Sequence, residues 1–293
     1  MLSGTSFERA QTVGQPFGAD MQPVPFYTLK LDVCSQEEAL QAIDSTLKAK
    51  RSGTLCFLNA HSFNVSRSDP LYHDVLLRSD LLLNDGVGIS IAARLAGIRL
   101  PENLNGTDFI PRLIAHAKEL GKRIYLLGGK PGVAEMAKKR LEERISEVAI
   151  VGTHCGYFDE VEEESIVGEI VDRKVDVLIV GMGVPRQELW LAHVAGRLPE
   201  GTLTVAGGAI LDFISGGVKR APLWLRRCDL EWLYRLWLEP RRMWQRYLIG
   251  NIVFLYHVLR LRRNRKTELM MCKKRAPDGL PERLPSGERT SVR

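Results

Sequence analysis

The stretch that decides the fold lies in the second half of the chain: VDVLIVGMGVPRQELW, residues 175–190. Its first six residues, 175–180, are apolar with one exception, and most are β-branched. A continuous apolar run of this length predicts a strand buried on both faces, as strands of parallel sheets are. Gly181 and Gly183 interrupt the run, and a helical pattern begins at Gln187. A strand, a glycine-containing loop and a helix in this order predict one half of a βαβ unit.

The same alternation extends in both directions, from Phe26 to about Gly217. Together with 175–180, the runs with strand character are 55–59, 80–83, 123–127, 148–152 and 202–206. The helical patterns between them are 36–48, 109–120, 133–145, 160–172 and 187–198. Strands that alternate with helices predict an α/β domain, doubly wound and Rossmann-like, around a mostly parallel sheet.

Composition is that of a globular protein: 293 residues, 45% hydrophobic and 26% charged. The five cysteines are scattered and form no CxxC pair, which predicts neither a disulfide framework nor a zinc site and favours a reducing compartment. Residues 1–25 show no secretory signal pattern and are expected to form a flexible lead-in. The longest apolar run, 248–259, is about half the roughly 20 residues that a membrane-spanning helix needs.

Basic charge is concentrated late in the chain. Residues 1–217 hold 22 basic and 28 acidic residues, whereas residues 218–275 hold 16 and 4. The sequence from 223 to 263 mixes arginines and tryptophans with an apolar helical stripe, and Pro240 is expected to divide it into two helices. Such helices are typical of membrane interfaces, although they also occur packed on their own domain; nucleic-acid binding is the weakest reading. The polar remainder, 264–293, is expected to be a disordered tail.

These boundaries predict four parts: a lead-in at 1–25, an α/β core at 26–222, a helical membrane-associating appendage at 223–263 and a tail at 264–293.

Glycines follow three of the predicted strands. Glycine permits close approach of a ligand to the backbone, and a helix N-terminus behind it suits a phosphate. The loops carry neither a dinucleotide fingerprint nor a Walker A motif, and for any one of them a simple tight turn is the better reading. Three such loops at one sheet edge nevertheless favour a nucleotide or sugar-phosphate site. The glycines concerned are Gly128, Gly129, Gly183 and Gly207.

Polar side chains stand at other strand ends. Asp85, in NDG after an apolar strand, is either a general base or a helix cap. Asn105 and Thr107 are suited to sugar hydroxyls, although Thr107 could instead cap the next helix. Arg186 could meet phosphate and Gln187 a sugar hydroxyl, or both could be ordinary first-turn polar residues. The sequence contains no HxxxH pair and no DxD triplet, so no metal site is predicted.

Several ordered blocks between about residues 26 and 258 resemble the WecG/TagA/CpsF family of glycosyltransferases. The resemblance implies transfer of a sugar from a UDP-sugar to a polyprenyl-pyrophosphate-linked saccharide, with inversion, without a metal or other cofactor, at the inner face of the cell membrane. N-acetylmannosaminuronic acid, N-acetylmannosamine and glucose remain possible donor sugars. The blocks are FLNAHSFN, LLLNDGVGI, ENLNGTDF, IYLLGGKPGVAE, GTHCGYF, VGMGVPRQE, AGGAILDFISGGVKRAPLWLRR and LEWLYRLWLEPRRMWQRYLIGN.

The resemblance also implies roles for single residues. It places the catalytic base on Asp85 and substrate contacts on Asn59, Gln187 and Asp212. The arginine-rich appendage would cover the active site at the membrane. Two positions depart from some members, Phe57 in place of a threonine and Asn103 in place of an arginine. The appendage arginines expected to meet membrane or pyrophosphate are Arg235, Arg242 and Arg246.

The sequence therefore favours a glycosyltransferase with a UDP-sugar donor, a polyprenyl-pyrophosphate-linked acceptor and an anionic membrane surface as partners, without nucleic acid and with a homo-oligomer possible. The alternative from another class is a non-catalytic nucleotide- or sugar-binding regulator with a basic tail that contacts nucleic acid. An epimerase or dehydrogenase is disfavoured, because neither the dinucleotide fingerprint nor a Tyr-x-x-x-Lys motif is present.

Overall fold

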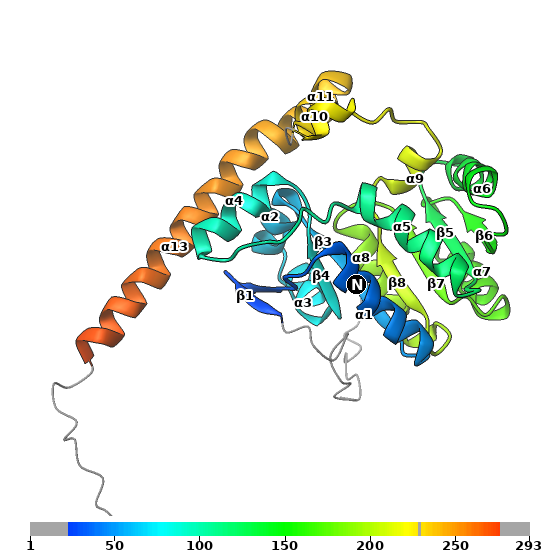
Figure 1. Cartoon of the computed structure of the whole chain (residues 1–293), viewed down its shortest axis with the longest axis horizontal. Helices are drawn as coiled ribbons and strands as arrows, with labels where there is room; N and C mark the ends of the chain where they lie inside the picture. The colour runs from blue at the N-terminus through cyan, green and yellow to red at the C-terminus, as the bar shows by residue number, and fades with distance from the viewer. Residues whose placement is uncertain (1–22, 228–229, 276–293) are drawn as a thin grey trace, which may run out of the picture.

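The computed structural model describes residues 23–227 and 230–275 and is built around a parallel sheet (Figure 1). Within the described residues, the six strands of this sheet lie in the order β4-β3-β8-β7-β5-β6, and every neighbouring pair is parallel. The predicted fold class is confirmed, and each predicted strand is present with its ends moved by at most two residues. The strands are β3 (Gly53–Leu58), β4 (Leu81–Asn84), β5 (Ile124–Gly128), β6 (Ile150–His154), β7 (Val177–Gly181) and β8 (Leu203–Ala206).

Both faces of the sheet are covered by helices. In β7, Val177 and Ile179 face one hydrophobic core, whereas Leu178 and Val180 face the other, which explains the continuous apolar run in the sequence. On one face lie α1 (Gln36–Lys48), α5 (Gly106–Glu119), α6 (Val133–Arg144) and α9 (Ile210–Ile214). On the other lie α2 (Ala60–Ser68), α3 (Pro70–Arg78), α4 (Val87–Ala96), α7 (Glu160–Asp172) and α8 (Arg186–Val194).

The topology places a crevice at one edge of the sheet. All strands are parallel, so their carboxyl ends share that edge. The chain leaves β3 toward β4 and leaves β5 toward β6, in opposite directions across the sheet. Open α/β sheets bind ligands where the connections diverge in this way.

A hairpin and two helices were not predicted from the sequence. A small antiparallel hairpin joins β1 (Val24–Phe26) to β2 (Leu29–Leu31), so ordered structure begins just inside the expected lead-in. Helices α2 and α3 follow β3, and the sequence of α2 is largely polar. The other lead-in residues, 1–22, lie outside the described part of the chain.

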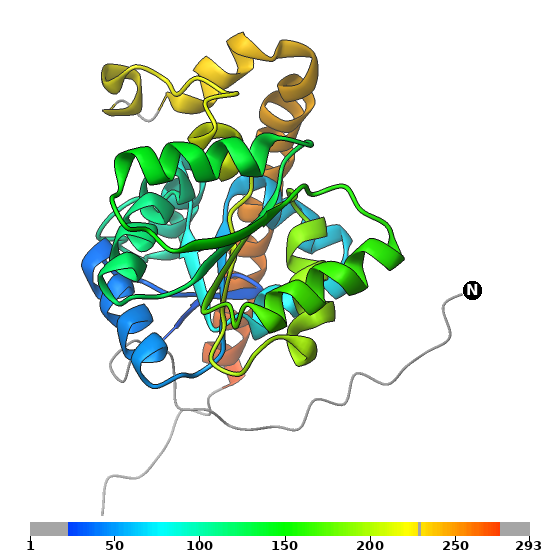
Figure 2. The same ribbon diagram turned by 90° about the vertical axis from the view of Figure 1, so that its right-hand side faces the viewer.

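The C-terminal segment is helical and is interrupted at Pro240, as predicted. Beyond the break, α13 lies along α2 and α4 at one side of the domain, with α10 and α11 at one end (Figures 1 and 2). The segment comprises α10 (Leu223–Arg227), α11 (Glu231–Leu238), α12 (Pro240–Trp244), the π-helical turn η2 (Gln245–Ile249) and α13 (Gly250–Arg275).

The apolar residues of this segment, predicted to form a single helix face, are divided between a buried face and an exposed face. Phe254 and Val258 of α13 are buried in a domain core, and the ring centroids of Phe254 and Phe63 are 5.3 Å apart. Leu255 and Leu259 are exposed. Part of the appendage therefore belongs to the α/β domain. The helix continues to Arg275, past the expected start of the tail at 264, and residues 276–293 lie outside the described chain.

Candidate active site

A pocket of about 470 Å³ opens at the carboxyl edge of the sheet. Loops after all six strands of the parallel sheet contribute to its walls, and side chains from α11 and η2 reach it from the C-terminal segment. The structure thus brings together residues that lie far apart in the sequence. The predicted site residues that line it are Asn59, Asp85, Thr107, Gly129, Gly183, Arg186, Gln187, Gly207, Asp212, Arg235 and Arg246.

Asp85 occupies the loop between β4 and α4. Its backbone N–H donates to the carbonyl of Leu58 at 2.8 Å, which anchors it beside the end of β3. Gly86, with φ of 87°, is the N-cap of α4, and no side chain caps that helix. Of the two sequence interpretations, the structure therefore does not use the Asp85 carboxylate as a cap and places it in the pocket instead.

The neighbours of Asp85 hold its carboxylate in place. The side-chain amide of Asn59 donates to Oδ2 at 3.3 Å. The other end of that amide, Oδ1, caps α2 by accepting from the backbone N–H groups of His61 and Ser62, so Asn59 is fixed in one orientation. On the far side, Oδ1 of Asn103 accepts from the N–H of Gly86 at 2.8 Å. Asn103, one of the departures noted in the sequence, thus steadies the loop that carries Asp85.

Opposing effects set the charge of Asp85. Burial is the largest and raises the pKa of its carboxyl, whereas the hydrogen bond from Asn59 and the charges of Arg235 and Arg246 lower it; the net direction is upward. A carboxylate with a raised pKa is a stronger proton acceptor than one in water. Nearby His61 is kept neutral, because burial first and then Arg246 lower its pKa to about 4.

Two appendage arginines line the pocket. The guanidinium of Arg235 in α11 lies over the ring of Phe213, 4.4 Å from the ring centroid, and Arg246 is contributed by η2. The side chain of Arg242, the third predicted arginine, lies outside the described residues.

Gln187 lines the pocket and also holds two of its loops together. Its side chain is 2% exposed, and Oε1 accepts from the N–H groups of Gly183 and Gly208, each at 3.0 Å. Its amide nitrogen donates to Glu188 at 2.9 Å. Gln187 therefore ties the loop after β7 to the loop after β8, and its carbonyl oxygen already has two donors.

The glycines shape the pocket rather than offering free N–H groups. The N–H of Gly129 bonds to Gly181 and that of Gly207 to Val180, while Gln187 accepts from Gly183. Gly128 is not part of the pocket lining; a Cβ there would lie 2.4 Å from the carbonyl oxygen of Gly181. It allows the ends of β5 and β7 to approach each other closely.

Asn105 is also absent from the lining. Its side chain caps α5 by accepting from the N–H of Asp108 at 2.9 Å, so Asn105 rather than Thr107 is the cap. Thr107 itself lines the pocket.

Sequence reasoning missed Lys130, Tyr157 and Phe213, which also line the pocket. Lys130 lies between the glycines of the GGKPG block, and its positive charge in a glycine loop could have indicated a contact with an anionic ligand. Tyr157 lies under Arg186, whose guanidinium is 5.8 Å from the ring centroid. The pocket thus combines two acidic side chains of raised pKa, Asp85 and Glu188, with several cations, an arrangement suited to proton abstraction beside a negatively charged leaving group. Among the described residues, no group of three His, Cys, Asp or Glu side chains is placed to hold a metal ion.

Comparison with known proteins identifies the family. The family model described as "Glycosyl transferase WecG/TagA/CpsF family" matches residues 24–268. A Bacillus subtilis (strain 168) protein named N-acetylglucosaminyldiphosphoundecaprenol N-acetyl-beta-D-mannosaminyltransferase is 34% identical over 197 residues, which cover 67% of this chain and 75% of that protein. A Bacillus spizizenii protein of the same name is 31% identical over 180 residues, covering 61% and 68%. These matches identify an enzyme rather than a non-catalytic regulator: the chain belongs to the WecG/TagA/CpsF family of glycosyltransferases.

Proposed function

We propose that this enzyme transfers a sugar from a UDP-sugar to a saccharide linked to polyprenyl pyrophosphate, with inversion at the anomeric carbon. The observation that carries the proposal is the Asp85 carboxylate, fixed by Asn59 in a pocket that Arg235 and Arg246 also line. Both relatives are named for an N-acetylmannosaminyl group and an N-acetylglucosaminyl-diphosphoundecaprenol. UDP-N-acetylmannosamine and that lipid-linked acceptor are therefore the first pair to test.

In this reaction, Asp85 acts as the general base. Its carboxylate takes the proton from the acceptor hydroxyl while the hydroxyl oxygen attacks the anomeric carbon. The bond from that carbon to the diphosphate breaks, and UDP departs with the bonding electrons. Asp85 must be ionised to start, so its raised pKa predicts a rate that falls as the pH drops through that pKa.

Protein cations stabilise the departing diphosphate. Lys130, Arg186, Arg235 and Arg246 all line the pocket, and preorganised positive charge at a leaving group lowers the barrier. We infer from this supply of charge that transfer needs no divalent metal. The check is to compare the initial rate in excess chelator with the rate in added Mg²⁺ or Mn²⁺. Equal rates are expected, and a rate that requires the metal would contradict the inference.

The function itself is tested with a panel of donors. UDP-N-acetylmannosamine, UDP-N-acetylmannosaminuronic acid and UDP-glucose are each incubated with a short-chain polyprenyl-pyrophosphate-linked N-acetylglucosamine, and products are read by mass spectrometry. One donor should add its glycosyl mass to the acceptor, with the β-configured bond expected from inversion of an α-linked donor. Failure of every donor to elongate any lipid-linked acceptor would refute the proposal.

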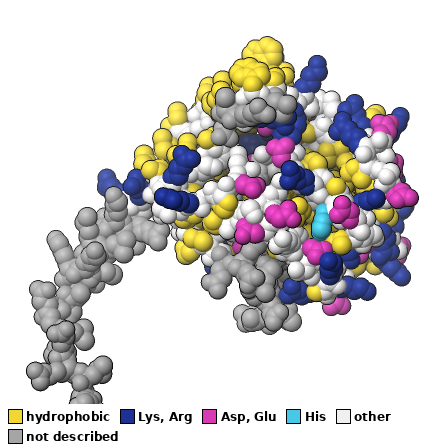
Figure 3. Space-filling model, viewed as in Figure 1, with side chains coloured by type: hydrophobic (Ala, Val, Ile, Leu, Met, Phe, Trp, Pro, Cys, Tyr) yellow, Lys and Arg dark blue, Asp and Glu magenta, His cyan; other side chains and the backbone are white. Residues whose placement is uncertain are grey.

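A further part of the proposal is peripheral association with the inner face of the membrane. Apolar side chains crowd the outer surfaces of α10, α11 and α13, visible in yellow at the top and along one edge of Figure 3. Trp237 is 74% exposed and Ile252 71%, beside a segment with a large basic excess. Apolar patches rimmed by arginine are suited to an anionic lipid surface. The described helices include none long and apolar enough to cross a bilayer.

Liposome flotation tests this association. Truncation at Gly217 would uncover the core contact between Phe254 and Phe63, so surface substitutions are the sharper probe. Trp237→Ser combined with Ile252→Ser should weaken flotation with anionic vesicles, whereas Val161→Ser, at an equally exposed site on α7, should not. Equal flotation of all three proteins would contradict a role for this surface.

A further inference from the structure

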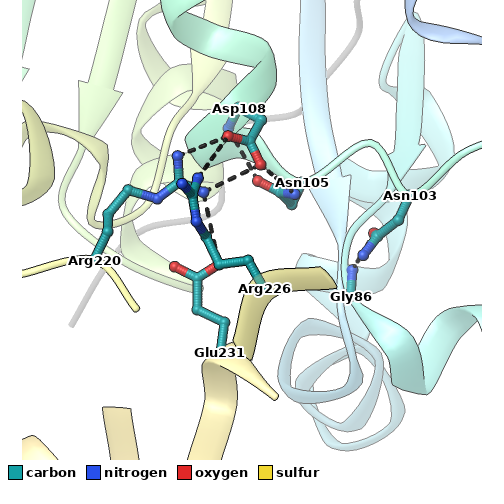
Figure 4. Close-up of polar contacts among 7 residues, drawn as sticks. All are labelled: Gly86, Asn103, Asn105, Asp108, Arg220, Arg226 and Glu231. Carbon is teal, nitrogen blue, oxygen red and sulfur yellow. Dashed lines mark hydrogen bonds and ion pairs between the residues drawn. The ribbon is translucent and has the colours of Figure 1, made fainter. Parts of the chain in front are cut away.

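A cluster of ion pairs connects the α/β domain to the C-terminal segment (Figure 4). Arg220, in the linker before α10, donates through Nη1 to Oδ1 of Asp108 at 2.6 Å and through Nη2 to Oδ2 at 3.1 Å. Asp108 belongs to the first turn of α5, directly after Gly106 and Thr107 of the pocket lining. Paired hydrogen bonds between arginine and carboxylate are among the strongest and most directional polar contacts in proteins.

The same cluster continues into the two following helices. Nη1 of Arg226 in α10 lies 3.7 Å from Oδ1 of Asp108. Nη2 of Arg220 lies 3.6 Å from Oε2 of Glu231, in the first turn of α11. Burial raises the pKa of Asp108, but the hydrogen bonds from Arg220 and Asn105 outweigh it and hold the pKa below its usual value, so the carboxylate stays ionised. We call Asp108, Arg220, Arg226 and Glu231 the latch.

Besides the latch, α11 is held by the ring of Trp232, whose centroid lies 6.0 Å from that of Tyr247 in η2, and by Arg235 on the ring of Phe213. It is eight residues long, its N-cap Leu230 offers no side-chain cap, and none of its side chains is buried. A helix this short is not stable in water without tertiary contacts. Yet α11 carries Arg235, which lies on Phe213 and lines the pocket. The placement of Arg235 therefore depends on what holds the start of α11.

From this geometry we propose that Asp108 and Arg220 are positioning residues that dock α11 on the domain and so place Arg235 in the pocket beside Asp85. Isolated surface ion pairs contribute little, but these side chains form a network, in which Arg220 is 26%, Glu231 23% and Asp108 47% exposed. The kinetic consequence rests on the proposed transferase function; the docking of α11 does not.

Hydrogen exchange of the full-length protein tests the docking directly. Asp108→Asn keeps the shape of the side chain and removes its charge, and Arg220→Gln removes the paired donors. Amide exchange across α11 should quicken by about tenfold in both variants, since the loss of a charged hydrogen-bonded pair typically costs a factor of that order. Asp108→Glu, which keeps the charge, should stay near the wild type. The matched control is Asp74→Asn, which removes the Asp74–Arg78 pair on α3.

Steady-state kinetics then tests the consequence for the site. Asp108→Asn and Arg220→Gln should lower kcat by about tenfold while changing the KM for the donor far less, because the glycine loops still form the pocket walls. Unchanged α11 exchange in both variants would overturn the proposal even if activity fell. Faster exchange with unchanged kcat would overturn the positioning role. If the wild type transfers no sugar, the proposed function fails, and the exchange comparison alone still decides whether the latch docks α11.

Discussion

Glu188 is a buried acidic group in the lining of the pocket, and its replacement by glutamine should make the stability of the protein less dependent on pH. The side chain is 1% exposed. Its Oε1 accepts from the side-chain amide of Gln187 at 2.9 Å. Burial raises the pKa of Glu188 to about 7, against the smaller opposing effects of hydrogen bonds from Gln187, the backbone and Tyr72.

The sign and size of the effect follow from proton linkage. Between pH 4.5 and about 7, the folded protein keeps a proton on Glu188 that the unfolded chain has released. The free energy of unfolding therefore falls as the pH rises through this window, and the destabilisation by ionised Glu188 is complete above pH 7. At about 1.4 kcal/mol per pKa unit, the cost is on the order of 3 kcal/mol. Glu188→Gln avoids it, because the amide is neutral at every pH.

Urea unfolding at pH 4.5 and at pH 8, followed by tryptophan fluorescence, measures the difference. The variant should be more stable than the wild type at pH 8 by up to about 3 kcal/mol and should lose most of that advantage at pH 4.5. Glu143→Gln, at an exposed position of α6, serves as the control. A Glu188→Gln difference that does not change with pH, or that grows toward acid, would refute the linkage argument.

Four further substitutions test the packing and chemistry of the site. Gly128→Ala should lower the free energy of unfolding in urea by about 3 kcal/mol, because its Cβ would meet the Gly181 carbonyl and φ is 147°. The control Gly168→Ala in α7, where a Cβ would meet nothing within 4 Å, should be neutral or stabilising. Equal effects of the two substitutions would contradict the steric reason. Asn59→Ala should lower the free energy of unfolding by about 1 kcal/mol, because α2 loses its N-cap. It should also move the acidic limb of the pH–rate profile to higher pH, since the hydrogen bond from Asn59 lowers the pKa of Asp85. An acidic limb at the same pH would count against that contact. Arg235→Lys and Phe213→Leu should each lower kcat by about fivefold, because each removes the contact between the guanidinium and the ring. An unchanged kcat in both variants would exclude a contribution of this contact to the reaction.

The parts of the fold that the sequence predicts are those fixed by local signals. Helices α1 and α7 have the predicted bounds, because Ser35 and Asp159 begin them with complete capping boxes. The strands were evident because both faces of the sheet are covered and most strand residues are apolar. Helix α2 escaped prediction because its residues are largely polar and its start depends on Asn59, which also serves Asp85.

The site was less predictable where function depends on long-range contacts. Asp85 could be proposed from a strand end and a glycine, and the structure places it in the pocket. The role of Gln187 required knowing that the loops after β7 and β8 meet. Asp108 and Arg220 are 112 residues apart and carry no motif that links them. Their pairing is visible only when α5 and the C-terminal segment are seen together.

The central claim, that Asp85 removes the acceptor proton, is tested most directly by the single-turnover rate of sugar transfer for Asp85→Asn. The variant keeps the size of the side chain, and its folding can be verified by urea unfolding. A lost general base predicts a rate lower by about 10² to 10⁴ with donor binding retained. A folded variant that transfers sugar at more than about a tenth of the wild-type rate would contradict the claim.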